Sequence, residues 1–119
     1  MLPSFSNENS LYSTTDVNPS TTNQSFFVDS NVILTYGPQI GPYGISVYTV
    51  LCSLANESGF CSPSINQIAT VTGVSETTVR KIVLLLQSHN LVEVTAMYNQ
   101  DGGRQANQYH LLPFNINNQ

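Results

Sequence analysis

The sequence carries very little charge. Asp, Glu, Lys and Arg make up 8% of its 119 residues, where a soluble protein usually has about a quarter. Three residues are basic and seven are acidic, which gives a formal net charge of −4. A large basic surface, the usual mark of a general nucleic-acid binder, is therefore excluded. The hydrophobic fraction of 40% is still enough for one compact core.

Residues that hold metals or carry out catalysis are also scarce. There are two cysteines and two histidines, without a CxxC spacing or a pair of neighbouring histidines. We expect Cys52 and Cys61 to be free thiols rather than zinc ligands, with a disulfide between them as the open alternative. No Ser/His/Asp set, phosphate-binding glycine loop or metal cluster can be assembled. The sequence thus predicts no enzyme, no cofactor, no metal and no small-molecule substrate.

Long hydrophobic stretches are missing too. No window approaches the length of a transmembrane helix, and the start of the chain has neither the basic nor the apolar region of a signal peptide. We therefore expect a cytoplasmic protein without membrane contact. Residues 1–25 are rich in Ser, Thr and Asn and have no hydrophobic period, which predicts a disordered tail. Residues 26–113 are expected to form one domain, and residues 114–119 a flexible C-terminus.

The stretch of residues 62–92 has the strongest pattern in the chain. Ser64 is followed three residues later by Gln67, the spacing of a capping box, which begins a helix. Gly73 permits the left-handed backbone of a tight reversal, and Ser75 is a favourable N-cap for a second helix. Two helices joined by so short a turn indicate a helix-turn-helix.

The second helix of this pair, expected over about residues 75–89, has two different faces. At about 100° per residue, one face is entirely apolar and should be buried: Val79, Ile82, Val83 and Leu86. The opposite face combines hydroxyls, a base and one leucine: Thr77, Lys81, Leu84 and Ser88, with Arg80 beside them. Hydroxyls and basic groups are what a recognition helix presents to phosphates and base edges in a major groove. On an isolated helix such residues would be ordinary solvated surface, so the flanking elements decide between the two interpretations.

The segment before the helix pair is expected to hold a further helix. The apolar run over residues 26–34 is ambiguous, because Asp29 or Ser30 would cap a short helix while its Phe, Val and Ile content favours a strand. The Gly and Pro residues over 37–42 predict a structured loop. Since proline suits the first turn of a helix, the main helix is expected over about residues 42–56.

A β-hairpin is predicted after the helix pair. Asn90 takes the stop position, because asparagine tolerates a left-handed cap. Residues 92–98 alternate between apolar and polar, NQDGGRQ is a strong turn signal, and the return strand is expected over residues 106–112. Phe60 and Cys61 would form a further, very short strand. The expected fold class is mainly α with a small β-hairpin (α+β), a three-helix core followed by a wing of two or three strands.

Three stretches of this chain carry a resemblance to a known family: IGPYGISVYTVLCSLAN, SPSINQIATVTGVSETTVRKIVLLLQSHNLVEV and GGRQANQY. They resemble the winged helix-turn-helix domains of phage and plasmid replication proteins and of related bacterial transcriptional regulators. The resemblance covers about residues 26–112. It implies a winged helix-turn-helix fold that contacts DNA through the recognition helix and through a wing over about residues 92–112.

The resemblance also implies which residues contact DNA. In the family, contacts come from the start and outer face of the recognition helix and from the wing. Carried over position by position, they fall on Ser75, Thr77, Thr78, Arg80 and Lys81, and on Arg104 at the wing tip. Ser62 and Ser64 precede a helix whose first backbone amides are free, so they would add phosphate contacts. Family members usually carry more basic residues than this chain does.

The leading hypothesis is therefore sequence-specific binding of double-stranded DNA. The protein would act as a small transcriptional regulator or as the DNA-binding domain of a replication initiator, as one chain or as a homodimer, and would be nucleoid-associated when bound. The alternative hypothesis is a protein–protein interaction module that uses the acidic surface and Leu84 and Leu85. It arises because three consecutive leucines cannot all be buried on one side of a helix.

Overall fold

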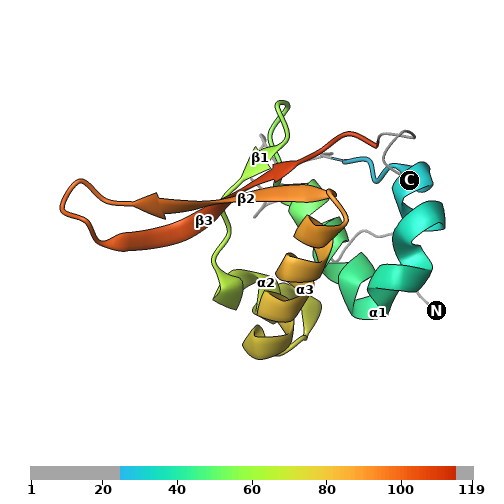
Figure 1. Ribbon diagram of the computed structural model, residues 1–119, viewed down its shortest axis with the longest axis horizontal. Coiled ribbons are helices and arrows are strands. Elements are labelled where there is room, and N and C mark those ends of the chain that lie inside the picture. The colour runs from blue at the N-terminus through green and yellow to red at the C-terminus, as the bar shows by residue number, and fades with distance from the viewer. Residues whose placement is uncertain (1–24, 115–119) are drawn as a thin grey trace, which may run out of the picture.

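The structure, a computed structural model, describes residues 25–114, so the predicted tail before Ser25 and residues 115–119 lie outside the described part. Three helices and a three-stranded antiparallel sheet make up the domain, and the hairpin formed by the last two strands extends well beyond the helices (Figure 1). This is the arrangement of a winged helix-turn-helix, which confirms the predicted α+β fold class. The elements are α1 (Ser30–Leu54), β1 (Phe60–Cys61), α2 (Ile65–Thr72), α3 (Glu76–Ser88), β2 (Val92–Tyr98) and β3 (Arg104–Leu111).

Helix α1 consists of two helical segments joined by a kink, and here part of the prediction was wrong. Asp29 caps the first segment, which begins at Ser30. The second part of the ambiguous apolar run is therefore helix rather than strand, whereas residues 26–29 belong to neither. At Gly41 the backbone leaves the helical region (φ 72°, ψ 179°), and Pro42 follows as the start of the second segment. The loop predicted over residues 37–42 is therefore helical apart from Gly41, because only that residue adopts a conformation reserved for glycine.

Helices α2 and α3 form the helix-turn-helix as predicted. The Ser64 Oγ accepts a hydrogen bond from the Gln67 N–H at 3.0 Å, and the Gln67 Oε1 accepts one from the Ser64 N–H at 2.8 Å, which completes the capping box. Gly73 ends α2 in the left-handed conformation with φ 74°. Ser75 caps α3, and Asn90 follows the helix with φ 60°. Each of these short-range signals was readable in the sequence.

The sheet has the strand order β1-β3-β2, so the return strand of the hairpin lies in the middle. The NQDGGRQ turn closes the hairpin, with the Asn99 N–H donating to the Gly103 carbonyl at 2.7 Å. β3 begins at Arg104, two residues before the predicted start at 106. The short strand expected at Phe60 and Cys61 is present as β1 and pairs with β3.

A β-bulge interrupts β3 in the outer half of the wing. The pairs on either side of the register shift are Thr95 with Gln108 and Met97 with Gln105. Ala106 and Asn107 therefore share the place opposite Ala96. Successive side chains of a strand alternate between faces, and an extra residue changes which of them share a face. As a result Arg104 and Asn107, three residues apart, lie on one face.

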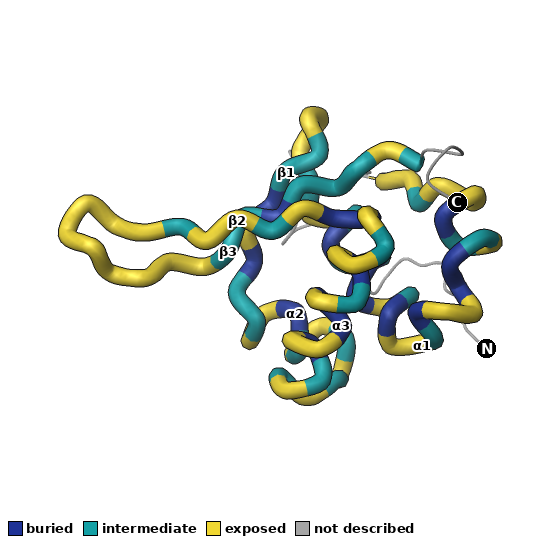
Figure 2. The backbone as a smooth tube through the Cα atoms, viewed as in Figure 1, coloured by how far each residue is buried: buried dark blue, intermediate teal, exposed yellow. Residues whose placement is uncertain are grey.

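A single hydrophobic core lies between the helices and the inner face of the sheet, whereas the outer wing is exposed (Figure 2). The apolar face predicted for α3 is buried in this core as expected. Residues 98–106 of the wing are all exposed. The largest fully buried side chains are Tyr109, Leu51, Ile68, Leu86, Val32, Val47, Val79 and Val92.

The cysteine and histidine side chains pack against other parts of the domain. Cys52 and Cys61 are free thiols, and burial, with a smaller contribution from Cys52, raises the pKa of Cys61 to about 11. The rings of His89 and His110 each pack against an aromatic side chain. None of the helices formed by residues 25–114 is long and apolar enough to cross a membrane.

Candidate nucleic-acid interface

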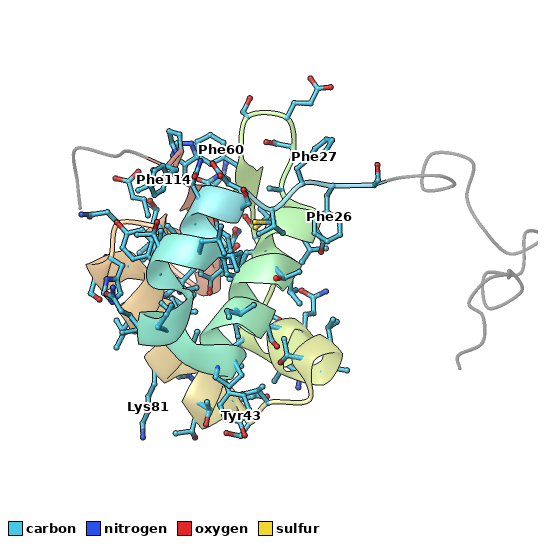
Figure 3. All side chains as sticks on the ribbon, turned by 90° about the vertical axis from the view of Figure 1, so that its right-hand side faces the viewer. Phe26, Phe27, Tyr43, Phe60, Lys81 and Phe114 are labelled. Carbon is cyan, nitrogen blue, oxygen red and sulfur yellow. The ribbon has the colours of Figure 1, made fainter. Side chains whose placement is uncertain are left out.

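The outer face of α3 presents the first group of predicted contact residues. At its start, the Ser75 Oγ accepts a hydrogen bond from the Thr78 N–H at 3.1 Å and donates one to the Thr78 Oγ1 at 3.0 Å. Thr78 is half-buried, whereas Thr77 is exposed. Lys81 is exposed and points away from the domain (Figure 3). Thr77 and Lys81 are thus free to meet a ligand, while Ser75 and Thr78 mainly hold the helix start.

Arg80 is held by its own helix. Its Nη2 lies 3.4 Å from the Glu76 Oε1, in an ion pair whose side chains are 60% and 42% exposed. The other Glu76 oxygen accepts a hydrogen bond from the Asn66 Nδ2 of α2 at 3.0 Å. Glu76 therefore links the two helices and neutralises one of the two cations of α3. Within residues 25–114 Lys81 forms no ion pair, so it is the unpaired positive charge of this helix.

A groove of about 320 Å³ separates the start of α2 from the wing. The Ser64 hydroxyl is used for capping, so the helix end presents instead the backbone N–H groups of its first turn, which have no partner within a helix. Ser64 and Arg104, far apart in the sequence, line the same groove, while Ser62 lies exposed outside it. The lining residues are Pro63, Ser64, Ile65, Arg104, Gln105, Ala106, Asn107 and Tyr109.

Arg104, the predicted wing contact, is fixed by three neighbours. Its Nη1 donates to the backbone carbonyl of Gln105 at 2.7 Å, and its Nη2 donates to the Asn107 Oδ1 at 2.9 Å. The guanidinium carbon lies 5.5 Å from the centroid of the Tyr98 ring, within cation–π distance. The Gln105 side chain in turn donates a hydrogen bond to the Asn99 Oδ1. The wing arginine therefore has a defined orientation although it is exposed.

The three consecutive leucines of α3 have three different environments. Leu84 is 68% exposed, Leu85 is half-buried and packs against the core, and Leu86 is fully buried. Only Leu84 is therefore available as an outward apolar contact. It lies one turn beyond Lys81 on the same side of the helix.

Several residues of this surface were missed by sequence reasoning as site residues. Glu76 and Arg80 are four residues apart, a spacing that could have indicated their ion pair. The pairing of Tyr98 with Arg104 depends on the hairpin register, and no local signal indicates that Asn66 reaches Glu76. In the described part of the chain, no group of His, Cys, Asp and Glu residues could hold a metal ion.

Residues 39–92 match the family model described as a helix-turn-helix domain. The matched range includes all of α2 and α3 and ends at the first residue of β2, so the wing lies outside it. No curated protein sequence matches this chain. The match supports a helix-turn-helix DNA-binding domain over these residues.

Proposed function

We propose that residues 26–113 form a domain that binds double-stranded DNA in a sequence-specific manner, with α3 in the major groove and the wing on the adjacent backbone. The observation that carries this proposal is the outer face of α3, where Thr77 and Lys81 are exposed while the other side of the helix is buried. A hydroxyl and an ammonium group at the start of such a helix match the acceptors of base edges and phosphates.

The contact residues divide between base and backbone. Thr77, in the first turn of α3, is placed to reach base edges, because recognition helices read bases with their N-terminal residues. Lys81 and Arg104 would bind phosphates. The groove at the start of α2 would hold a further phosphate, since the free N–H groups and the helix dipole favour an anion there. Three hydroxyl residues and one arginine at the edges of this surface complete the set of proposed DNA contacts: Ser62, Ser75, Thr78 and Arg80.

The small number of cations limits the affinity and its salt dependence. With at most three phosphates neutralised, the logarithm of the binding constant should fall with a slope of about −3 or shallower per chain against the logarithm of the salt concentration. The Glu76 carboxylate beside Arg80 brings the expected slope closer to about −2. Two copies on one site would double it. The slope therefore also tests whether a homodimer binds.

Fluorescence anisotropy with labelled duplexes at low salt tests the proposal. Lys81→Ala should weaken binding several-fold on every duplex, because a phosphate contact is independent of sequence. Gln87→Ala, which changes an exposed residue near the C-terminal end of α3, is the matched control and should leave affinity unchanged. Thr77→Ala should change the order of preference among duplexes. Absence of binding by the unaltered protein at high micromolar concentration would refute the proposal.

The biological role follows from where the preferred site lies. A site upstream of a gene would fit a small transcriptional regulator, and a site within a replication origin would fit the DNA-binding domain of a replication initiator. Mapping the bound fragments of the source genome distinguishes the two roles.

The exposure of Leu84 favours a second candidate function, contact with another protein chain. A leucine on the outer face of a recognition helix has no charge to offer a phosphate, but it would bury well against an apolar partner. Light scattering of the unaltered protein and of Leu84→Glu separates the two functions. A shift from dimer to monomer in the variant would support protein contact, and a monomer in both would count against self-association through this residue.

A further inference from the structure

We propose that Asn107 is the positioning residue of the wing arginine, holding Arg104 so that its remaining N–H groups face the groove and a DNA phosphate within it. This inference rests on the proposed DNA binding and deepens it. It assigns Asn107 a role through Arg104 rather than in direct contact with DNA.

The β-bulge brings the two side chains together. In a regular strand, residues three apart point to opposite faces, so Asn107 could not reach Arg104. Because Ala106 and Asn107 share the place opposite Ala96, both Arg104 and Asn107 lie on one face of β3. That face carries Tyr109 into the core and looks toward the start of α2, as the shared lining of the groove indicates.

The contacts leave most of the guanidinium available. An arginine has five N–H donors in a planar fork, and here one goes to the Asn107 Oδ1 and one to the Gln105 carbonyl. The guanidinium carbon also lies over the Tyr98 ring, 5.5 Å from its centroid. The other three donors make no hydrogen bond within residues 25–114, so a phosphate would meet an arginine that its neighbours already hold in one rotamer. Pre-organisation of this kind strengthens binding because less side-chain entropy is lost.

The chemistry of the holding group differs between the two arginines. Arg80 is held by the carboxylate of Glu76, which cancels its charge. Arg104 is held by a neutral amide, a backbone carbonyl and an aromatic ring, and among residues 25–114 it pairs with no carboxylate. A neutral acceptor fixes the guanidinium and leaves its full charge for a phosphate. Asn107 is therefore suited to positioning, whereas Glu76 is suited to masking.

A purely structural role for Asn107 would run through Tyr109 instead. The Tyr109 hydroxyl is buried and makes no hydrogen bond within the described part of the chain. Asn107 and Tyr109 line the same groove, and the Asn107 amide opposes the rise in the pKa of Tyr109 that burial causes. If Asn107 served to tie the wing to the core, removal of this hydroxyl would have the same effect as removal of the amide. Tyr109→Phe is thus the control that separates the two roles.

A double-mutant cycle tests the proposal, with anisotropy of one labelled duplex as the measurement. Arg104→Ala should weaken binding roughly tenfold and Asn107→Ala roughly threefold, while the double variant should bind no more weakly than Arg104→Ala alone. Gln108→Ala, on the opposite face of the same strand, should leave binding unchanged, as should Tyr109→Phe. In thermal unfolding, Asn107→Ala should have a melting temperature close to that of the unaltered protein.

Asn107→Asp gives the sharpest result. A carboxylate at this position would still hold Arg104 but would cancel its charge, so the salt slope should become shallower by about one, as in Arg104→Ala. Asn107→Ala should leave the slope unchanged because the charge remains. Two results would overturn the positioning role. One is a double variant in which the losses of DNA affinity of the two single variants add, and the other is a loss of affinity in Tyr109→Phe equal to that in Asn107→Ala. If the unaltered protein binds no duplex at all, the DNA-binding proposal fails first, which keeps the two failures distinct.

Discussion

The recognition helix α3 and the wing would both contact DNA, yet they are held in place by different forces. Helix α3 buries one whole face in the core, including the fully buried Leu86. The wing buries side chains only at its base, and residues 98–106 are all exposed. Packing therefore fixes the position of α3, whereas hydrogen bonds and the stacking of Arg104 on Tyr98 order the outer wing. The difference indicates that mutations on the buried face of α3 should act through stability and those in the outer wing through side-chain orientation.

The largest difference is expected in stability. Leu86→Ala should lower the free energy of unfolding by about 3 kcal/mol, because it leaves a cavity in a fully packed core. Met97→Ala, a half-buried apolar residue of the wing, should cost less than about 1 kcal/mol. Urea unfolding followed by circular dichroism measures both. Equal losses would mean that the wing is packed as tightly as the helix.

The base of the wing should behave like the core, and alkaline pH tests this. Burial raises the pKa of Cys61 in β1 from the ordinary 9.0 to about 11. Between these values the unfolded chain binds fewer protons than the folded one, so stability should fall as pH rises from about 9 to about 11, by on the order of 2 kcal/mol at most. Well below pH 9 this thiol is protonated in both states, so it should contribute nothing to the pH dependence of stability.

Cys61→Ala is the comparison for that experiment. The variant starts from a lower stability at neutral pH, but its stability curve should be flatter above pH 9 than that of the unaltered protein. Parallel curves for the two proteins would contradict a buried thiol at the base of the wing.

A smaller difference is expected between the capping groups of the two regions. Ser75→Ala should cost about 1 kcal/mol, since the serine oxygen satisfies the Thr78 N–H at the start of α3. Asp101→Ala removes a similar contact to the Gly103 N–H at the wing tip, but it should cost less than about 0.5 kcal/mol because water replaces that contact at an exposed turn. Thermal unfolding of both variants checks the order of the two losses.

The smallest expected effect concerns the masking of Arg80. Glu76→Gln should tighten DNA binding roughly two- to fivefold and steepen the salt slope by up to about one, because an exposed ion pair no longer competes with phosphate. Glu93→Gln in β2 removes the same charge at a distance from α3. Equal tightening in both variants would show that only the net charge matters and that Glu76 does not mask Arg80.

Most of the helix-turn-helix could be predicted because its signals are local. The capping box at Ser64, the left-handed Gly73 and the N-cap Ser75 each depend on residues within one turn. The buried face of α3 follows from its 3.6-residue period in the same way. These features also indicated the candidate contact residues Thr77 and Lys81, which are exposed.

The kink of α1 could not be predicted, because it depends on packing between residues on its two sides. Two Gly-Pro pairs look like a loop locally, yet Tyr36 and Ile40 are buried and keep the first segment helical. A Cβ at Gly44 would lie 2.6 Å from the Cβ of Ile40, so close contact across the kink requires glycine. Nothing in the local sequence distinguishes a loop from this arrangement.

The wing site could be predicted only in part, for a similar reason. The turn sequence indicates that Arg104 lies near the wing tip. Tyr98 and Asn107 are its partners because of the hairpin register and the bulge. A one-residue difference in strand pairing would give Arg104 other neighbours. The groove shared with Ser64 exists only once the fold has brought the wing beside the start of α2.

The most direct test of sequence-specific DNA binding is selection of bound duplexes from a random pool by the unaltered protein. We predict enrichment of one common motif. The same motif should be recovered at lower yield with Lys81→Ala, which loses a phosphate contact, and a different base preference should appear with Thr77→Ala. A pool that stays random after repeated selection at low salt would contradict the proposed function.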